Sequence, residues 1–383
     1  MKARILSLLL PFLLCFSACG ETPIPAATAQ NDSPDNEQLR RDIGEMLLVG
    51  FRGTKVDATH HIVRDIQQYH VGSVILFEYD APSGTRHRNV SSPQQLKNLC
   101  DYLQNLTPER LLISVDQEGG MVTRLKVRDG FPATRSPQST ATEGDNAVRD
   151  NARVVAQMLH NAGINLNFAP CVDVNVNPAC PVIGKLERSF SEKPDRVTQC
   201  ARIWIEEQRK QGILSCLKHF PGHGSAKGDT HAGLVDVTDS WQSLELQPYR
   251  DLIANGGVDM VMVAHVINRN LDTLPASLSP KVIRDLLRDS LGFQGVVITD
   301  DLAMGAIAKQ YGLEETLRLA ILAGSDLLCL SNNGSAPYDP DLVPKAVEAI
   351  ERMVADGRLS AQDIHASAER IRALKQKNAP DNH

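Results

Sequence analysis

The chain has 383 residues, 42% of them hydrophobic, and its 40 Lys and Arg against 46 Asp and Glu give a formal net charge of −6 at pH 7. A chain of this composition can bury a large core, and it lacks the overall positive charge that draws proteins to nucleic acid. We therefore expect no nucleic-acid partner, and a substrate that is a small molecule or a polymer fragment held in a pocket.

The N-terminal end has the layout of a secretory signal. Lys2 and Arg4 precede an apolar run at residues 5–16, which small residues follow and which is too short to cross a membrane comfortably. The residues around Cys19 resemble a bacterial lipobox, in which the cysteine is lipidated and becomes the mature N-terminus. Ordinary signal cleavage near Ala18, without a lipid, is the alternative.

These features predict three segments. They are a lipoprotein-type signal peptide at residues 1–19, a flexible linker rich in Pro, Ala and polar residues at 20–38, and one folded domain at 39–378. Because Gly20, and not Asp, follows the candidate lipidation site Cys19, we expect an outer-membrane lipoprotein that faces the periplasm. A soluble periplasmic or secreted protein is the alternative.

From residue 44 onward, short apolar runs alternate with longer amphipathic stretches. Nearly continuous apolar runs, without the alternation of a half-exposed strand, are typical of parallel strands buried on both faces. Eight such runs are present: Met46–Phe51, Val71–Phe77, Leu111–Asp116, Ile164–Val174, Gly212–Phe220, Val258–Val266, Gly295–Asp301 and Gly324–Leu330.

The stretches between these runs have helical patterns. Three of them end in glycine, as helix C-termini prefer: Asn146–Gly163, Lys193–Gly212 and Ser279–Gly292. Eight β/α alternations predict an α/β protein built as a single (β/α)8 TIM-type barrel, which helices at residues 340–377 close. The other fold considered is an open doubly wound sheet. That fold needs G-x-G-x-x-G after the first strand, and the sequence there does not have it.

Catalytic residues of such barrels lie at the carboxyl ends of the strands and on the loops that follow. Polar residues occupy these positions after five of the predicted strands: Asp116, Glu118, Arg124, Asp173, Asn175, Arg188, Lys218, His219, His265, Asp300 and Asp301. Because carboxylates, histidines and cations converge from five strands, the sequence predicts a site at this end of the barrel.

Six cysteines lie beyond the N-terminal segment, and none forms a C-x-x-C pair, which argues against a zinc ribbon or a thioredoxin-type motif. Several lie in apolar or helical patterns and are interpreted as buried thiols. Cys171 and Cys180 flank one loop, and a bridge between them is left open because the sequence does not supply its geometry.

The stretch Lys218–His231, KHFPGHGSAKGDTH, admits three interpretations. His219 and His223 have the spacing of metal ligands on one helix face, but Pro221 and the neighbouring glycines disfavour a helix. A phosphate cradle needs the order G-x-x-x-x-G-K-[ST], which the stretch does not have.

The third interpretation is a mobile loop. Gly222, Gly224 and Gly228 permit positive φ angles and large movement, as in a loop that closes on a substrate. Asp229 and His231 can bond to each other in a tight turn, where the carboxylate raises the pKa of the imidazole. The sequence therefore predicts an acid–base pair on a mobile loop, and no metal site.

KHFPGHG, followed at this spacing by DTH, resembles the signature of family 3 glycoside hydrolases of the β-N-acetylhexosaminidase type. DQEGGMVTRL, NFAPCVDVN, ERSF and GVVITDDLAMGAI are similar to further blocks of that family, in the same order, and the resemblance covers residues 44–332. It points to the single-domain enzymes of Gram-negative bacteria, most of which are cytosolic and act in peptidoglycan recycling. The exported N-terminus departs from that pattern.

The resemblance implies a role for each matching residue. Asp300 stands at the position of the nucleophile, His231 at that of the acid/base, and Asp229 at that of its dyad partner. Five residues match the positions that hold the sugar: Asp116, Arg124, Arg188, Lys218 and His219. Asp301 is expected to be structural, and His265 is left between a site-lining and a core position.

The implied activity is that of a retaining exo-β-N-acetylglucosaminidase that removes terminal GlcNAc from peptidoglycan-derived or related oligosaccharides, without cofactor or metal. The expected partners are these oligosaccharides and, through Cys19, the membrane, and we expect a monomer. The alternatives are a β-glucosidase or a glycoside phosphorylase of the same family, and a non-catalytic sugar-binding lipoprotein. Glucosidases of this family take their acid/base from a second domain, of which the sequence gives no sign.

Overall fold

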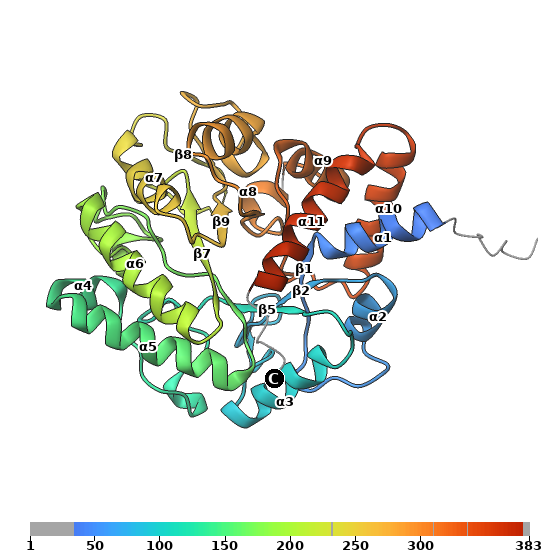
Figure 1. Cartoon of the computed structure of the whole chain (residues 1–383), viewed down its shortest axis with the longest axis horizontal. Helices are drawn as coiled ribbons and strands as arrows, with labels where there is room; N and C mark the ends of the chain where they lie inside the picture. Colours follow the sequence, from blue (N-terminus) through green and yellow to red (C-terminus); the bar gives the residue numbers. More distant parts are fainter. Residues whose placement is uncertain (1–33, 231–232, 309, 335, 378–383) are drawn as a thin grey trace, which may run out of the picture.

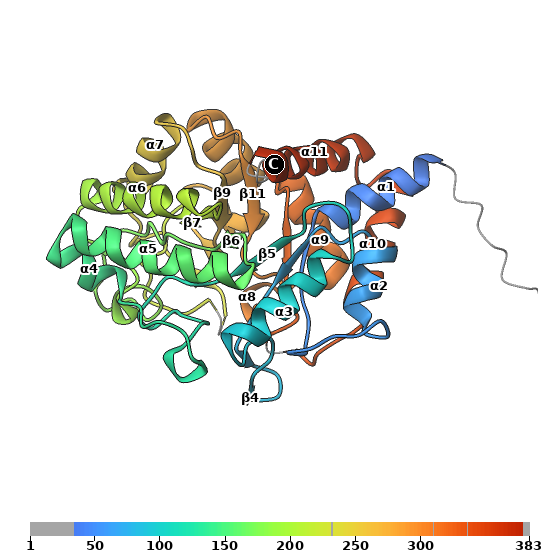
Figure 2. The same cartoon turned by 60° about the horizontal axis from the view of Figure 1, so that its bottom comes forward.

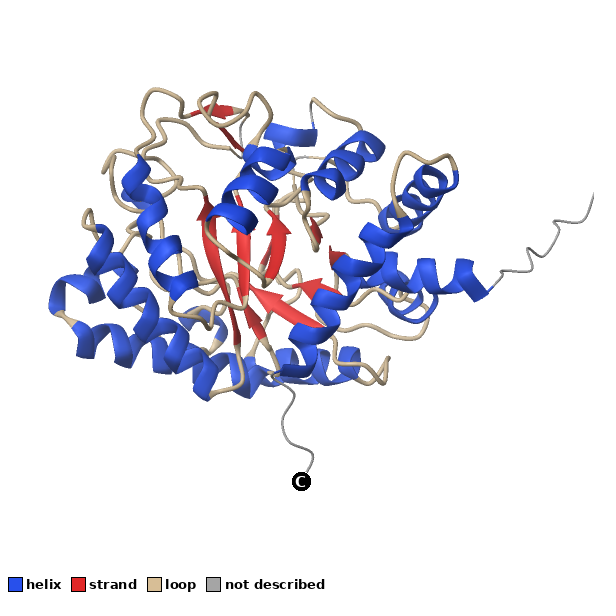
Figure 3. Cartoon of the chain, turned by 45° about the horizontal axis from the view of Figure 1, so that its top comes forward, coloured by secondary structure: helices blue, strands red, loops and turns tan. Residues whose placement is uncertain are grey.

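The computed structural model describes residues 34–230, 233–308, 310–334 and 336–377. At the centre of the molecule, parallel strands form a ring that helices surround (Figure 3). The eight strands are β1 (Leu47–Gly50), β2 (Ser73–Ile75), β5 (Leu112–Val115), β6 (Leu166–Asn167), β7 (Leu214–Phe220), β9 (Met260–Val263), β11 (Val296–Thr299) and β12 (Leu328–Leu330). Each lies within one of the eight apolar runs, so the predicted strands are confirmed.

The strands lie in the order β11-β9-β7-β6-β5-β2-β1-β12, and all neighbours pair in parallel. The two end strands meet through a parallel bridge between Ile298 and Leu327, and the Thr299 N–H donates to the Leu327 carbonyl at 3.1 Å. The predicted (β/α)8 TIM-type barrel is therefore confirmed. Every residue of these eight strands is buried, as expected where helices cover the outside and side chains fill the inside.

Helices form the outer layer (Figure 1). They are α1 (Pro34–Glu45), α2 (His61–Gln68), α3 (Pro93–Gln104), α4 (Pro137–Glu143), α5 (Asp145–Ala162), α6 (Pro194–Lys210), α7 (Gln247–Ala254), α8 (Gly305–Ala308), α9 (Leu313–Ala323), α10 (Leu342–Ala355) and α11 (Ala361–Lys377). Short 3-10 turns lie at η1 (Val127–Asp129), η2 (Gly184–Leu186), η3 (Ser243–Leu246) and η4 (Ala276–Leu278).

Local sequence sets the ends of these helices. Helix α3 begins after Ser92, whose hydroxyl accepts the N–H of Gln95 at 3.2 Å, and α5 ends at Gly163 in the left-handed conformation, with φ +79°. The helix predicted over residues 279–292 is present as η5 (Lys281–Ser290), which is wound in the wider π form.

Helices α1 and α11, the first and the last of the described chain, pack together (Figure 1). Lys375 of α11 pairs with Glu45 of α1 at 2.6 Å. The flexible linker predicted at residues 20–38 is wrong at its C-terminal end, because helix α1 begins at Pro34. The proline and the acidic residues in the first turn of α1 suit a helix N-terminus. The rest of that segment and the predicted signal peptide lie outside the described residues.

The cysteines beyond the N-terminal segment are all buried free thiols, which confirms the prediction of buried thiols for Cys200, Cys216 and Cys329. The possible bridge between Cys171 and Cys180 is not formed. Cys171 Sγ instead donates to Asp173 Oδ2 at 3.2 Å, and Cys180 Sγ donates to the carbonyl of His223 at 3.6 Å.

Two small sheets lie on loops that follow the barrel strands. β3 (Tyr79–Asp80) and β4 (Thr85–Arg86) form an antiparallel hairpin after β2, and β8 (Val235–Asp236) pairs in parallel with β10 (Val266–Ile267). Within the described residues, no helix combines the length and the apolar character needed to cross a membrane.

Candidate active site

A cavity of about 730 Å³ lies at the carboxyl ends of the barrel strands. Its lining includes seven of the eight residues that the sequence predicts for catalysis and sugar binding: Asp116, Arg124, Arg188, Lys218, His219, Asp229 and Asp300. The eighth, His231, lies outside the described residues, as does Cys19. The structure thus brings together every predicted cavity residue that it describes.

We call the cavity residues Asp116, Arg124 and Lys218 the charged floor, and ion pairs join them to one another and to the buried Glu118. Lys218 Nζ lies 2.7 Å from Asp116 Oδ1 and 2.7 Å from Glu118 Oε1. Arg124 Nη2 lies 3.4 Å from Asp116 Oδ2, and the Arg188 guanidinium donates to both carboxylate oxygens of Glu118, at 2.9 and 2.7 Å. Strands β5 and β7 position this network, because Asp116 directly follows β5 and Lys218 lies near the end of β7.

The ion pairs keep the floor charged. Burial alone would raise the pKa of Glu118, but Arg188 and Lys218 lower that pKa to about 2. Burial also opposes ionisation of Asp116, yet Lys218 and Arg124 hold the pKa of this carboxyl below its usual value. Burial would lower the pKa of Lys218, but Asp116 and Glu118 raise it. The floor therefore offers carboxylate acceptors and cationic donors, which are the groups that bind sugar hydroxyls.

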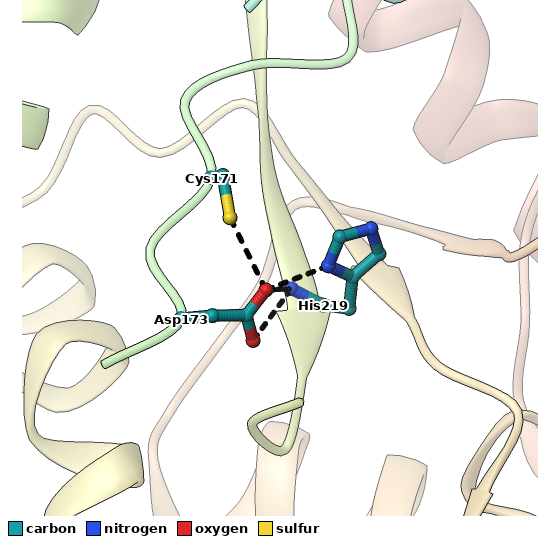
Figure 4. A group of neighbouring side chains, drawn as sticks. All are labelled: Cys171, Asp173 and His219. Atoms are coloured by element: carbon teal, nitrogen blue, oxygen red, sulfur yellow. Dashed lines mark hydrogen bonds and ion pairs between the residues drawn. The ribbon is translucent and has the colours of Figure 1, made fainter. Parts of the chain in front are cut away.

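His219 is held between Asp173 and Arg188. Its Nδ1 lies 2.7 Å from Asp173 Oδ2 (Figure 4), and its Nε2 lies 3.1 Å from Arg188 Nη2. Because a guanidinium only donates, Nε2 accepts, and the proton of the neutral ring belongs on Nδ1, where it is donated to Asp173. Asp173 thus fixes the orientation of His219 at the cavity wall.

Cys171, Asp173 and His219 have ligand atoms close enough to hold a metal ion (Figure 4). The Asp173 oxygens, however, already accept from Cys171 Sγ, from His219 N and Nδ1, and from the His223 N–H at 2.7 Å. Burial lowers the pKa of His223 to about 4, its Nε2 lies 3.4 Å from Thr230 Oγ1, and its ring lies edge-on to that of His219 with the ring centroids 5.8 Å apart. Hydrogen bonds to Asp173 account for this cluster, and a metal ion would have to displace these hydrogen bonds in order to bind.

Asp300 follows β11 directly and lines the cavity. Its N–H donates to the Val263 carbonyl at 2.9 Å, and its Oδ1 accepts the N–H of Asp301 at 2.8 Å. These bonds fix the carboxylate at the end of the strand, where the sequence predicts the nucleophile.

The neighbours Asp301 and His265 have structural contacts. Asp301 Oδ1 accepts the N–H groups of Ser331 and Ala303, both at 3.1 Å, and burial raises the pKa of this carboxyl. His265 is fully buried, with Nδ1 2.6 Å from Ser277 Oγ and Nε2 2.9 Å from the Asp301 carbonyl. Asp301 lines the cavity together with Asp300, but its carboxylate is held by these backbone donors, so a structural role stays the prediction for it, and the open choice for His265 resolves to a core histidine.

The loop predicted to be mobile is anchored over its first part, because residues 221–226 are all buried. Glu245 Oε2 accepts the N–H groups of Gly224 and Ser225, at 3.1 and 3.3 Å, and Asn177 Nδ2 donates to the Ala226 carbonyl at 2.8 Å.

Close packing explains the first two glycines of this loop better than movement does. A Cβ on Gly222, which has φ +122°, would lie 2.6 Å from Glu245 Cβ, and one on Gly224 would lie 1.8 Å from the Val174 carbonyl oxygen. Gly222 thus has the positive φ angle predicted for it, but the prediction of large movement at Gly222 and Gly224 is wrong. Exposure begins only at Lys227.

Glu245 gives this anchor a pH dependence. Burial raises the pKa of its carboxyl from 4.5 to about 7, so the folded protein retains a proton that the unfolded chain has lost. The free energy of unfolding should therefore fall as pH rises from 4.5 to 7, by up to about 3 kcal/mol from this group. In Glu245→Gln this decrease should be absent, as urea titrations at pH 5 and pH 8 would measure. Glu348→Gln, at an exposed glutamate of α10, is the control, and a wild-type pH dependence in Glu245→Gln would contradict the assignment.

Several residues of the site carried no predicted role. Glu118 and Asp173 were recognised only as polar residues at strand ends, and their function as partners of Arg188 and His219 depends on three-dimensional contacts. Glu78, which lines the cavity and pairs with Lys126 at 2.6 Å, directly follows the apolar run that predicts β2. Its position at a strand end could have identified Glu78 as a site residue. No comparable feature of the sequence marks Glu245.

Residues 38–374 match the family model described as the glycosyl hydrolase family 3 N terminal domain. The chain belongs to this family. Its relatives include a β-hexosaminidase of Alkalilimnicola ehrlichii, 35% identical over 320 residues that cover 81% of this chain and 84% of the relative. A β-hexosaminidase of Neisseria meningitidis serogroup B is 35% identical over 294 residues, which cover 73% and 74% of the two chains.

Solved structures agree with this family 3 assignment. A family 3 β-N-acetylglucosaminidase from Paenibacillus sp. matches with a TM-score of 0.80 and 36% identity over 90% of this chain, which spans only 63% of that longer protein. The M. tuberculosis protein LpqI matches with a TM-score of 0.74 and 32% identity, over 88% of this chain and 93% of LpqI. The family 3 protein described here is a glycoside hydrolase of the β-hexosaminidase type.

Proposed function

We propose that this family 3 enzyme is a retaining exo-β-N-acetylglucosaminidase that removes terminal GlcNAc from peptidoglycan-derived or related oligosaccharides. One observation carries the proposal: Asp300 and Asp229 line the same cavity as the charged floor of Asp116, Arg124 and Lys218. A retaining glycosidase needs a carboxylate that attacks the anomeric carbon and a proton donor for the leaving oxygen, beside groups that hold the sugar.

In the first step, a carboxylate oxygen of Asp300 bonds to the anomeric carbon while the bond to the leaving oxygen breaks. His231 gives its proton to that oxygen. In the second step, His231 takes a proton from water, the water oxygen bonds to the anomeric carbon, and the bond to Asp300 breaks. Two inversions at one carbon give net retention. Asp229, two residues before His231, orients the imidazole and stabilises its protonated form.

The floor supplies the binding that positions the sugar for this chemistry. Asp116 accepts hydrogen bonds from sugar hydroxyls, and Arg124 and Lys218 donate to sugar oxygens. Because their mutual ion pairs fix these groups before substrate arrives, little reorganisation is needed at the moment of reaction. Glu118 and Asp173 act through Arg188, Lys218 and His219, and are positioning residues.

The names of similar proteins support GlcNAc as the sugar, since matched structures include β-N-acetylglucosaminidases from Paenibacillus sp. and Thermotoga maritima. The test compares p-nitrophenyl β-N-acetylglucosaminide with the corresponding β-glucoside, each with and without phosphate. We expect the GlcNAc derivative to be cleaved at least tenfold faster, with no acceleration by phosphate. A preference for the glucoside would favour a β-glucosidase, and acceleration by phosphate with formation of a sugar phosphate would favour a phosphorylase. Failure to cleave either substrate would contradict the proposed function.

We also propose that the enzyme is an outer-membrane lipoprotein facing the periplasm, on the basis of its signal-like N-terminus and Cys19. This location would place it beside peptidoglycan. Cys19→Ala should remove the lipid attachment site and shift the protein out of the membrane fraction or block its processing. Cys15→Ala, in the same segment, is the matched control. Membrane partitioning and gel mobility of Cys19→Ala equal to those of the wild type would contradict the lipid anchor.

A further inference from the structure

Apolar side chains gather at one side of the cavity mouth. Phe77, Tyr79, Met121 and Val122 line the cavity, and we call this group the apolar lip. Tyr79 is 46% exposed and Met121 is 69% exposed, and these are two of the four large hydrophobic side chains that the described residues expose. Single exposed apolar residues are ordinary, but their concentration at a cavity mouth marks a binding surface.

Two adjacent loops build the apolar lip. Strands β2 and β5 pair in the barrel, the β3–β4 hairpin with Tyr79 follows β2, and the turn with Met121 follows β5. That turn is fixed, because the N–H groups of Glu118 and Gly119 both donate to the Val122 carbonyl, at 3.0 and 3.1 Å. A Cβ on Gly119 would lie 2.2 Å from the Arg135 carbonyl oxygen, so close packing holds the backbone that presents Met121.

Buried charges hold the hairpin, which projects from the body of the barrel (Figure 2). Asp80 is buried and pairs with Arg88 at 2.6 Å and Arg52 at 2.8 Å. Asn333, from the loop after β12, donates to the Tyr79 carbonyl at 3.1 Å and accepts the N–H of Ala81 at 2.9 Å. Tyr79 is therefore presented on a braced support, which reduces the entropy lost when a ligand packs on its ring.

The apolar lip and the charged floor suit two different parts of a substrate. The floor suits hydroxyl groups and lines the same cavity as Asp300, so it belongs to the GlcNAc whose anomeric carbon Asp300 attacks. The cavity mouth must accommodate the leaving group. A pyranose has an apolar face of C–H groups, and aromatic and thioether side chains pack on such a face.

We propose that the apolar lip is the binding site for the leaving sugar, with Tyr79 and Met121 packing on the apolar face of its ring. The inference rests on the proposed function and adds to it the feature by which the leaving group is recognised: the C–H face of a sugar ring. The apolar lip thus makes the enzyme selective for oligosaccharides over GlcNAc joined to a small leaving group.

The test uses two substrates that share the cleaved sugar, namely chitobiose, with a sugar leaving group, and β-N-acetylglucosaminyl fluoride, with a single-atom leaving group. Tyr79→Ala should raise KM for chitobiose about fivefold to tenfold and change KM for the fluoride less than twofold. Tyr79→Phe and Tyr79→Trp should restore the chitobiose KM, because each keeps a ring. Met121→Ala should act in the same direction with a smaller effect.

Val154→Ala, at an exposed apolar residue of α5, is the matched control and should leave both KM values unchanged. Equal effects of Tyr79→Ala on both substrates, or no effect on chitobiose, would overturn the leaving-sugar site while the proposed function stands. A wild-type protein that cleaves neither substrate would overturn both.

Discussion

Asp300→Asn should lower kcat/KM for p-nitrophenyl β-N-acetylglucosaminide on the order of 10⁴-fold. The amide is nearly isosteric with the carboxylate, and the backbone bond from the Asp300 N–H to the Val263 carbonyl is untouched, so the fold should persist. What is lost is the negative oxygen that bonds to the anomeric carbon, and no neighbouring group replaces it, because Asp301 is occupied by backbone donors. Initial rates and thermal unfolding, measured on the same preparation, separate lost chemistry from lost folding.

Asp285→Asn, at an exposed aspartate of η5, is the matched control and should retain wild-type rates. A small nucleophile adds a second readout. Azide should partly restore activity to Asp300→Ala, whose truncated side chain leaves room for the anion, and the product should be the α-glycosyl azide. Activity of Asp300→Asn within tenfold of the wild type would show that another residue is the nucleophile.

His231→Ala should lower kcat/KM for chitobiose on the order of 10³-fold, because the departing sugar needs a proton at its oxygen. p-Nitrophenol leaves without one, so the first step with the nitrophenyl substrate should be nearly preserved. The second step still lacks its base, and stopped-flow measurements should therefore show a burst of p-nitrophenol before a slow steady state. Asp229→Ala should give a milder loss of the same kind, since it removes only the partner of the imidazole.

Equal losses on chitobiose and on the nitrophenyl substrate would contradict the acid/base role of His231. A metal-dependent mechanism predicts a different pattern, in which a chelator abolishes wild-type activity and added zinc restores it. We expect the wild-type rate to be unchanged by the chelator.

The barrel could be predicted from the sequence because strands buried on both faces leave a strong signal. A run such as Val258–Val266 cannot alternate with polar residues when helices cover one face and the barrel interior the other. Strand length was less predictable. The run Ile164–Val174 forms only the two-residue strand β6, although the chain beyond it still pairs with β7 through a parallel bridge between Cys171 and Lys218 before it reaches Asp173, the partner of His219.

Much of the site could also be predicted, because barrel topology alone puts residues such as Asp116 and Lys218 at one end of the molecule. The contacts that hold these residues in place could not be predicted. Glu245 reaches the loop after β7 from a later turn, and nothing in its local sequence indicates that it accepts two backbone N–H groups there. Movement was wrongly predicted at Gly222 and Gly224 for the same reason. The sequence does not distinguish a glycine that close packing requires from a glycine that allows the chain to move.

The apolar lip was also beyond sequence reasoning. Tyr79 lies after a buried strand, as many structural residues do, and its exposure depends on the brace that Asp80 and Asn333 provide. Met121 follows two glycines, a pattern common to turns in general.

Trapping of the covalent intermediate tests the central claim most directly. A fluorinated GlcNAc glycoside that slows the second step should add the mass of one sugar to the protein, and peptide mass spectrometry should locate that sugar on Asp300. Asp300→Asn should remain unlabelled under the same conditions. A sugar attached to Asp301 or Asp229 would contradict the assignment of Asp300 as the nucleophile. Rapid hydrolysis of the natural substrate with no adduct at any position would contradict the retaining mechanism itself.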